Sequence, residues 1–291
     1  MRIAIYGNTH QTDHLDELAR FFASLAHHNV WIEMDLRFYN YLCEVLPEPP
    51  AVSETVAPGA DFSAALAISI GGDGTFLRTA RWVGDREIPI VGINTGHLGY
   101  LADVHILEAE RLLDDLHGGR FKTESRSLIE VVLPDNAPDC WPYALNEVAF
   151  LKKDTASMLS AHATLNGRDL TSYIGDGLIV ATPTGSTGYN LSVGGPIIEP
   201  TSESWVLSPI APHSLTMRPL VVTDRSFIEV TTDSRAASSY LLSLDGRSIS
   251  LPVGTTVALR RAPFVTRVVQ RVDHHFASAL RQKLLWGMDK R

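Results

Sequence analysis

Cysteine and long apolar runs are scarce in this sequence. Its 291 residues include only two cysteines, Cys43 and Cys140, which are far apart. They suit a reducing compartment and cannot supply the spacing of a zinc site. The chain has no run of about eighteen apolar residues, the length that a membrane-spanning helix needs. Its N-terminal apolar stretch is too short for a secretory signal. We therefore expect a soluble, cytoplasmic protein with no membrane partner.

Positive charge is also in short supply. The chain has 25 Lys and Arg against 33 Asp and Glu, a formal net charge of −8. Binding to a nucleic-acid backbone depends on clustered Lys and Arg, so we expect no nucleic-acid partner. A polyphosphate ligand would need local attraction from backbone amides, metal ions and a few cations. The eleven histidines show no spacing typical of metal ligands, so the residues alone leave any metal ligands unknown.

The first part of the chain alternates strand and helix patterns. Strands are predicted at residues 2–6, 30–34, 65–70 and 88–93. Helical spacing of apolar residues follows Thr12, a short helix follows residue 74, and another helix is predicted at residues 107–116. Strands separated by helices favour parallel pairing in a doubly wound sheet, with ligands at the carboxyl ends of the strands. We expect an α/β, Rossmann-like domain at residues 1–120.

From about residue 121 the pattern changes to short β-rich runs separated by turn residues. These runs are residues 128–133, 144–151, 178–182, 220–222, 227–231, 240–244, 255–259 and 265–269. They predict a mostly β, largely antiparallel domain at residues 121–270. The last segment, residues 271–291, contains a helix at about residues 275–285 with apolar side chains that need a surface. We expect this helix to pack back on the first domain.

A glycine-rich loop follows the predicted strand at residues 65–70. Its sequence is Gly71, Gly72, Asp73, Gly74 and Thr75, and it opens a helix. Glycine lets the backbone approach a phosphate closely, and the free amides of the helix favour negative charge. A tight strand-to-helix turn would explain one or two glycines, but three glycines around an acidic residue are more than a turn requires. We interpret the loop as a phosphate-binding loop.

Asp73 is unexpected in a loop that only binds phosphate, because its carboxylate repels the ligand. It makes sense if it accepts a hydrogen bond from an attacking hydroxyl or helps to hold Mg²⁺. General-base assistance contributes a rate gain of about 10²–10⁴, whereas positioning and charge neutralisation dominate phosphoryl transfer. We predict that Asp73 is an orienting acceptor first and a base second. Arg78 follows about one helical turn later, where it either meets a phosphate or is a solvated helix residue.

Two further segments carry polar groups next to apolar strands. Asn146 and Glu147 offer an amide and a carboxylate, a match for vicinal ribose hydroxyls if the pair lies at a strand end or bulge. Without other evidence the pair would be read as a solvated strand edge. Residues 175–196 then lead from an apolar strand into a loop rich in Gly, Ser and Thr, with Tyr189 inside it. Such a loop can hold an adenine and its ribose.

Taken in order, these motifs resemble the NAD kinase family. They are Gly71–Thr75, Asn94-Thr95-Gly96-His97-Leu98-Gly99, Asn146-Glu147, the segment from Asp176 to Ser192 with its Thr-Pro-Thr-Gly-Ser-Thr, and Pro212-His213-Ser214-Leu215. The resemblance covers nearly the whole chain. Gly-Gly-Asp-Gly alone is also found in lipid kinases and phosphofructokinases, but the segment from Asp176 to Tyr189 and its distance from Asp73 are much more specific.

The resemblance implies transfer of the terminal phosphate of ATP to the adenosine-ribose 2′-hydroxyl of NAD, which yields NADP. It also implies a divalent metal, usually Mg²⁺, and a homo-oligomer, either a dimer or a tetramer. Asp73 would be the proton acceptor. The residues expected to bind NAD are Asp73, Gly74, Arg78, Tyr100, Asn146, Glu147, Asp176, Thr187, Gly188, Tyr189, Asn190, Leu191 and Ser192. The phosphate loop would comprise Gly71, Gly72, Gly74 and Thr75.

Some features depart from the family pattern or leave alternatives open. Ile174 lies where some relatives have a basic residue, and Arg247 ends a turn that often ends in Gln. His213, beside a proline in an apolar segment, is interpreted as structural. The two alternative functions are a lipid kinase of the diacylglycerol or sphingosine type and a non-catalytic dinucleotide sensor. The acidic balance and the hydroxyl-rich loop count against the first, and Asp73 counts against the second.

Overall fold

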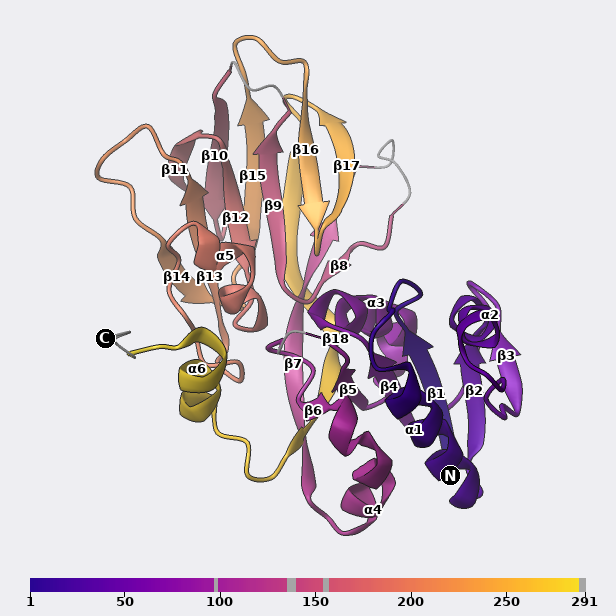
Figure 1. Ribbon diagram of the computed structural model, residues 1–291. Coiled ribbons are helices and arrows are strands. Elements are labelled where there is room, and N and C mark those ends of the chain that lie inside the picture. The colour runs from indigo at the N-terminus through magenta and orange to yellow at the C-terminus, as the bar shows by residue number, and fades with distance from the viewer. Residues whose placement is uncertain (97–98, 135–139, 154–156, 288–291) are drawn as a thin grey trace. The chain divides into compact units, whose positions relative to one another are not determined.

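The computed structural model describes residues 1–96, 99–134, 140–153 and 157–287. These residues divide into two compact units. The α/β unit comprises Met1–Ser125 together with Thr266–Arg291, and the β unit comprises Arg126–Val265. The first unit thus extends slightly beyond residue 120 and resumes shortly before residue 270. Figure 1 shows the helices and strands of both units.

The α/β unit is built on a parallel sheet. Its strands, in spatial order, are β3 (Glu54–Val56), β2 (Trp31–Asp35), β1 (Arg2–Gly7), β4 (Leu66–Ile70), β5 (Ile90–Asn94) and the C-terminal part of β18 (Thr256–Arg271). A short strand, β6 (Val104–His105), also pairs with β5 in parallel. The strand order reverses between β1 and β4, which is the point where ligands bind in open α/β sheets. The predicted doubly wound sheet is confirmed.

Helices and 3₁₀ turns connect and cover these strands. They are α1 (Leu15–His27), α2 (Leu36–Val45), α3 (Asp73–Val83), η1 (Gly84–Arg86), η2 (Ile106–Arg111), α4 (Leu112–His117) and α6 (Phe276–Leu284). Helix α3 packs against β1, β4 and β5, while α2 packs against β2 and β3. The apolar core contains fully buried side chains from β1, α1 and α2, including Ile5, Leu18 and Phe38. Helix α6 belongs to this unit, as predicted.

Helix α2 was not predicted from the sequence, because its aromatic residues, Asn, Cys and Val weaken the helical preference of its Leu, Arg and Glu residues. Burial and capping stabilise it instead. The side chain of Asp35 accepts a hydrogen bond from the Phe38 backbone N–H at 3.0 Å and so caps the helix N-terminus. Phe38 and Leu42, four residues apart, both point into the core.

The β unit contains two antiparallel layers. One sheet has the order β14 (Leu220–Thr223), β13 (Ser204–Ile210), β12 (Gly177–Ala181), β9 (Glu147–Lys152), β16 (Ser239–Leu244) and β17 (Arg247–Pro252). The other contains β11 (Arg168–Gly175), β10 (Leu159–Leu165), β15 (Ile228–Asp233) and the N-terminal part of β18, with β7 (Phe121–Val132) and β8 (Tyr143–Ala144). Buried side chains of both sheets, such as Phe150, Trp205, Tyr173 and Val230, share one core. The mostly β second part of the fold is confirmed.

Four strands of the β unit were not predicted from the sequence, and one strand was predicted as two. Strands β10, β11, β13 and β17 were not expected, and β17 in particular has a largely exposed, polar sequence. The runs predicted at residues 255–259 and 265–269 belong to the single strand β18. Pro263 takes an exposed position between buried Ala262 and Phe264, so the alternation of β18 continues through it.

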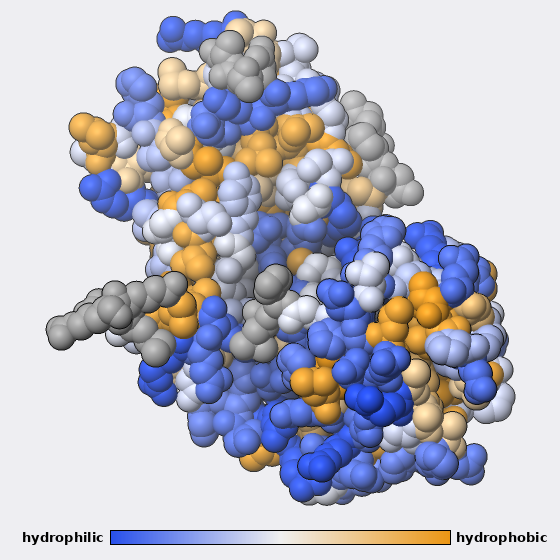
Figure 2. Space-filling model, viewed as in Figure 1, coloured by the Kyte–Doolittle hydropathy of each residue, from blue (hydrophilic) through white to orange (hydrophobic). Residues whose placement is uncertain are grey.

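None of the described helices is long and apolar enough to cross a membrane. On the visible face of the α/β unit, hydrophilic residues cover most of the surface around α4, and apolar residues are confined to smaller patches (Figure 2).

Candidate functional site

The glycine-rich loop lies at the carboxyl ends of β4 and β5. The Gly71 N–H donates to the Ile93 carbonyl at 2.9 Å, which ties the loop to the end of β5. Gly71 has φ of 145°, and a Cβ there would lie 2.5 Å from the Thr75 hydroxyl, so only glycine fits. At Gly72 a Cβ would meet no atom within 4 Å, and at Gly74 it would meet only the Arg78 guanidinium at 3.9 Å. The loop therefore has open space beside its backbone.

Asp73 is the first residue of α3, and backbone amides hold its carboxylate. The Oδ2 atom accepts from the Tyr100 N–H at 2.7 Å, and Oδ1 accepts from the Leu101 N–H at 3.0 Å. A Cβ at Gly99 would overlap the Asp73 carboxylate, so glycine is required there for close approach. The positive end of the α3 dipole also favours this negative charge. The carboxylate is thus fixed in orientation, and each oxygen keeps a lone pair for a further donor.

Arg78 and Tyr100 flank this arrangement within the α/β unit. Arg78 is exposed, and its Nη2 donates to the Thr75 hydroxyl at 3.0 Å. Burial raises the pKa of Tyr100, whose hydroxyl has no hydrogen-bond partner among the described residues. Its ring lies 5.5 Å from the Lys283 ammonium. His97 and Leu98 of the expected Asn94–Gly99 motif lie outside the described residues.

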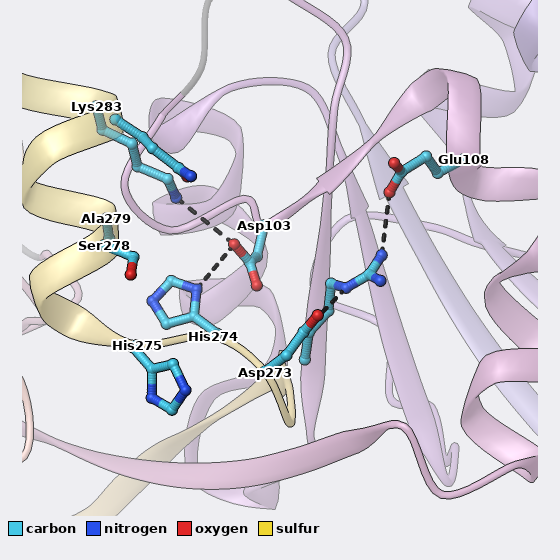
Figure 3. Close-up of a pocket in the computed structure, with 10 residues that line it drawn as sticks. Asp103, Glu108, Asp273, His274, His275, Ser278, Ala279 and Lys283 are labelled. Carbon is cyan, nitrogen blue, oxygen red and sulfur yellow. Dashed lines mark hydrogen bonds and ion pairs between the residues drawn. The ribbon is translucent and has the colours of Figure 1, made fainter.

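The segment after Tyr100 is anchored to α6 by charged groups (Figure 3). Asp103 Oδ1 lies 3.0 Å from His274 Nδ1 and 3.7 Å from Lys283 Nζ. Burial alone would raise the pKa of Asp103, but the His274 hydrogen bond and the two positive charges hold it below its usual value. Burial lowers the pKa of Lys283, although Asp103 and Asp73 oppose that effect. A pocket of about 360 Å³ lies beside this cluster.

Sequence reasoning missed Asp103 and Lys283. Lys283 lies four residues after Ala279, so both occupy the same face of α6. Ala279 is 3% exposed, and the Lys283 side chain is 5% exposed. A lysine on the apolar face of a terminal helix was the available signal, because such a lysine requires a buried carboxylate partner.

In the β unit, a third carboxylate shapes the Asn146–Glu147 pair. Asp245 accepts from the backbone N–H groups of Leu145 and Asn146 at 2.8 Å each, and of Glu147 at 3.2 Å. These bonds hold the chain where it leaves β8 and enters β9. The pair therefore lies at a strand end, which is the condition for both side chains to reach one ligand.

Glu147 carries a perturbed carboxyl group. Burial, and then the nearby charge of Asp245, raise its pKa to about 7, although the Tyr189 backbone N–H opposes the shift. Its Oε2 is buried without a hydrogen-bond partner among the described residues, and so is Asn146 Oδ1. A Cβ at Gly188 would lie 3.1 Å from that Oε2 and 3.3 Å from Asn146 Nδ2. An unsatisfied acceptor pair beside a glycine is suited to a ligand with hydroxyl donors.

The loop after β12 folds against this pair through η3 (Thr184–Thr187) and α5 (Tyr189–Ser192). The Thr182 hydroxyl donates to the Leu145 carbonyl at 2.6 Å and accepts from the Gly185 N–H at 3.1 Å. A Cβ at Gly185 would overlap the Asn146 backbone, so the approach requires glycine. The loop is therefore positioned by the same backbone that presents Asn146 and Glu147.

The side chains within that loop differ in accessibility. Asn190 is fully buried; its amide donates to the carbonyls of Ser186 and Pro196 at 3.1 Å and accepts from the Ser208 hydroxyl at 2.6 Å. Its side chain is thus engaged in holding the loop. Tyr189 is 40% exposed. The remaining predicted residues of the loop, Thr187, Gly188, Leu191 and Ser192, are partly or fully accessible.

Asp176 lies at the other end of β12 from this arrangement. Gly177 pairs with Leu151, whereas Ala181 pairs with Glu147. At about 3.3 Å per residue, Asp176 is roughly 16 Å from the Glu147 end of the strand. Its carboxylate forms an ion pair with Lys152 at 2.6 Å. Within one chain, the β unit does not bring Asp176 to the Asn146–Glu147 pair.

The structure also shows the surroundings of Arg247, His213 and Ile174. Arg247 donates to the carbonyls of Trp141 and Tyr143 at 2.8 and 2.7 Å, so its guanidinium supports the chain before β8. The His213 N–H donates to the Ile174 carbonyl at 2.9 Å. The Ile174 side chain is 44% exposed.

Family models and curated relatives match the chain along its length. The model described as ATP-NAD kinase N-terminal domain matches residues 28–121, and the ATP-NAD kinase C-terminal domain matches residues 145–271. The chain is 43% identical to the NAD kinase of Bacteroides fragilis over 291 residues, 100% of both chains. It is 44% identical to the NAD kinase of Porphyromonas gingivalis over 289 residues, 98% of each.

Two solved structures have folds similar to that of this chain. A yeast NADH kinase complexed with NADH has a TM-score of 0.88 at 21% identity, covering 100% of this chain and 89% of that one, which shows a shared fold. An Archaeoglobus fulgidus NAD kinase in complex with ATP has a TM-score of 0.71 at 27% identity, covering 94% of both chains. With two family models and full-length relatives in agreement, the chain belongs to the NAD kinase family.

Proposed function

We propose that this protein is an NAD kinase that transfers the terminal phosphate of ATP to the adenosine-ribose 2′-hydroxyl of NAD, producing NADP. The curated relatives carry the name NAD kinase over the whole length of the chain. The related structures hold ATP in one case and NADH in the other. No observation favours a lipid kinase or a non-catalytic sensor.

The observation that carries the proposal is the held carboxylate of Asp73 beside a glycine loop with open space. Two backbone N–H groups fix its orientation, and the remaining lone pairs can accept a hydrogen bond from the acceptor hydroxyl. Asp73 then orients that oxygen toward the phosphorus and takes its proton as the new bond forms. The amides at the start of α3 stabilise the phosphate charge. Positioning and electrostatics therefore carry most of the rate gain.

We assign ribose recognition to Asn146 and Glu147. Each presents a buried oxygen that lacks a hydrogen-bond partner among the described residues. Ribose hydroxyl groups can donate to both, and the Glu147 carboxyl can also donate when it is protonated. Its pKa of about 7 means that either form is accessible near neutral pH. The exposed ring of Tyr189 provides an apolar face for the adenine.

The other ligand assignments are proposals of the same kind. Gly74, Arg78 and Tyr100 would contact the phosphates or line the dinucleotide pocket, and Asp176 would face the nicotinamide end. The loop contacts would come from Thr187, Gly188, Tyr189, Asn190, Leu191 and Ser192; for Asn190 the backbone is the available part, because its side chain is engaged.

We propose that Mg²⁺ arrives bound to the phosphates of ATP, as part of the donor substrate. Mg²⁺ is commonly bound by substrate phosphates with only one or two protein carboxylates. Within the part of the chain that the structure describes, no three or more His, Cys, Asp or Glu side chains form a metal-binding group. When bound, the ion would neutralise charge on the donor phosphates.

We also propose a cytoplasmic homo-oligomer, either a dimer or a tetramer. The β unit exposes apolar side chains on and beside its edge strand β14: Leu215 is 90% exposed, Val221 50% and Leu220 37%. Pairing of this edge with a second copy would cover them. Light scattering at assay concentration tests the proposal, and a monomer would contradict it.

Activity is tested by incubating the protein with ATP, Mg²⁺ and NAD and measuring NADP by mass spectrometry. We expect NADP that depends on all three components. A folded protein that binds NAD but forms no NADP would refute the kinase and favour a sensor.

A further inference from the structure

A second pocket, of about 460 Å³, lies in the α/β unit. Four arginines are among its lining residues: Arg37, Arg78, Arg81 and Arg86. One acidic residue, Asp35, also lines it. For a chain with net charge −8, this is a strong local concentration of positive charge.

The fold brings these arginines together from separate elements. Arg78 and Arg81 are three residues apart on α3 and so share one face of that helix. Arg37 is the second residue of α2, directly after β2, and Arg86 ends η1. Tyr6 and Asp35 place the carboxyl ends of β1 and β2 at the pocket. It therefore lies at the ligand-binding edge of the sheet, beside the reversal of strand order between β1 and β4.

Most of this positive charge is unmatched. Arg86 forms an ion pair with Asp61 and lies over the Phe62 ring at 4.8 Å. For Arg37, Arg78 and Arg81, no carboxylate among the described residues lies within ion-pair distance. The Asp35 carboxylate caps α2 through its bond to the Phe38 N–H, and the nearby charge of Arg37 partly opposes the rise that burial causes in the pKa of Asp35. Three guanidinium groups around one pocket repel each other, and a bound polyanion would relieve that repulsion.

Two aromatic side chains, Tyr6 and Trp82, line the same pocket. Trp82 lines it and stacks on Phe62 with ring centroids 4.0 Å apart. The ring of Tyr6 lies 5.7 Å from that of Trp82. The indole N–H of Trp82 is buried and has no acceptor among the described residues.

We propose that this arginine pocket binds the phosphate chain of the donor beyond the transferred group. Arg78 connects the two places, because its Nη2 bonds to Thr75 of the glycine loop while its side chain lines the pocket. The planar guanidinium fork matches phosphate oxygens in pairs. The ligand chemistry is a linear polyphosphate, whether part of a nucleoside triphosphate or inorganic. The inference rests on the proposed function, since it assigns a subsite to that reaction's donor.

Calorimetric binding of inorganic tripolyphosphate tests the pocket without any reaction. The test variant is the double substitution Arg37→Gln and Arg81→Gln; the control is Arg168→Gln and Arg235→Gln, which removes the same charge from exposed positions of the β unit. We expect the test variant to bind about tenfold more weakly than the wild type, the scale for two partly exposed charge pairs. The control should stay within about twofold. Equal affinity of the test variant and the wild type, or equal loss in both variants, would overturn the proposal.

Steady-state kinetics then separate this inference from the kinase assignment. In the test variant, KM for ATP should rise about tenfold while KM for NAD stays unchanged. Reactions with ATP or inorganic polyphosphate as sole donor show which source the pocket serves. Normal NADP formation with unaltered donor KM and tripolyphosphate affinity would refute the pocket and leave the kinase standing. If the variant loses tripolyphosphate binding and the wild type forms no NADP, the pocket stands and the kinase assignment is refuted. Unchanged urea midpoints would verify folding, as expected for exposed residues.

Discussion

Replacing Glu147 by glutamine removes an ionisable group from the β unit and keeps nearly the same side-chain shape. In the folded protein, burial and the nearby Asp245 raise the pKa of Glu147 from 4.5 to about 7. A carboxyl group with a raised pKa prefers its neutral form, so ionisation costs folding free energy. That cost is absent below pH 4.5, grows as the pH rises towards 7, and is constant above it.

The size of the cost follows from the two pKa values. At about 1.4 kcal/mol per pKa unit, the difference between 4.5 and about 7 corresponds to about 3 kcal/mol above neutral pH. Between about pH 5 and about pH 8.5, the change is roughly 2–3 kcal/mol, because some of the cost is already present at the lower pH. The glutamine variant does not carry this cost. Its stability relative to the wild type should therefore rise by roughly 2–3 kcal/mol over that interval.

Urea unfolding at the two pH values, followed by circular dichroism, measures this difference. Comparing the variant with the wild type at both pH values cancels any fixed packing effect of the amide. Glu199→Gln is the matched control, because Glu199 is an exposed glutamate of the same unit, and it should show no pH-dependent gain. The same Glu147→Gln variant should have a higher KM for NAD, since it loses the proposed ribose acceptor.

A stability difference that is the same at both pH values would refute the reasoning, because it would mean that Glu147 titrates alike in the folded and unfolded chain. A variant that loses stability relative to the wild type as the pH rises would contradict the sign.

Three further substitutions test the α/β unit. Asp73→Asn should lower kcat by about 10²–10⁴ while NAD binding persists in calorimetry; near-normal turnover would remove Asp73 from the mechanism. Gly99→Ala should lower kcat about a hundredfold, because its Cβ would overlap the Asp73 carboxylate. Gly96→Ala, where a Cβ meets nothing within 4 Å, is its control, and equal effects would contradict the steric argument. Asp103→Asn should destabilise the unit by about 3 kcal/mol at neutral pH, since it leaves buried Lys283 without a carboxylate. The variant should also exchange the amide hydrogens of α6 faster than the wild type, and unchanged exchange would refute this anchoring. Because the pKa of Asp103 is depressed in the folded protein, the wild type should lose stability as the pH falls through that pKa, and the variant should lose less.

Local patterns predicted most of the α/β unit. Four strands and the loop at residues 71–75 were found because apolar runs, helical spacing and glycine act over a few neighbouring residues, whereas the short strands β3 and β6 were not predicted. Helix α2 was missed because its local helix propensity is mixed, and burial of Phe38 and Leu42 stabilises it further. Strand β17 was missed although Ile249 and Leu251 alternate with serines, because the run is short and its partner β16 supplies the hydrogen bonds that define it.

Some residues of the candidate site could be predicted from the sequence, and others could not. The sequence picked out Asp73, Asn146 and Glu147 by residue type and position beside apolar strands. It did not reveal the role of Asp245, which binds three backbone amides from about a hundred residues away along the chain. Nor did it separate the buried side chain of Asn190 from the exposed ring of Tyr189 in the same loop.

By itself, the sequence determined the alternation of strands and helices, the glycine loop with its carboxylate, and the resemblance to the NAD kinase family. Those features are local, because each is written in neighbouring residues. Only the tertiary structure decided what surrounds each charged group: the amides that hold Asp73, the burial that raises the pKa of Glu147, and the four arginines of one pocket. Burial and electrostatics depend on groups that are distant along the chain and adjacent only after folding.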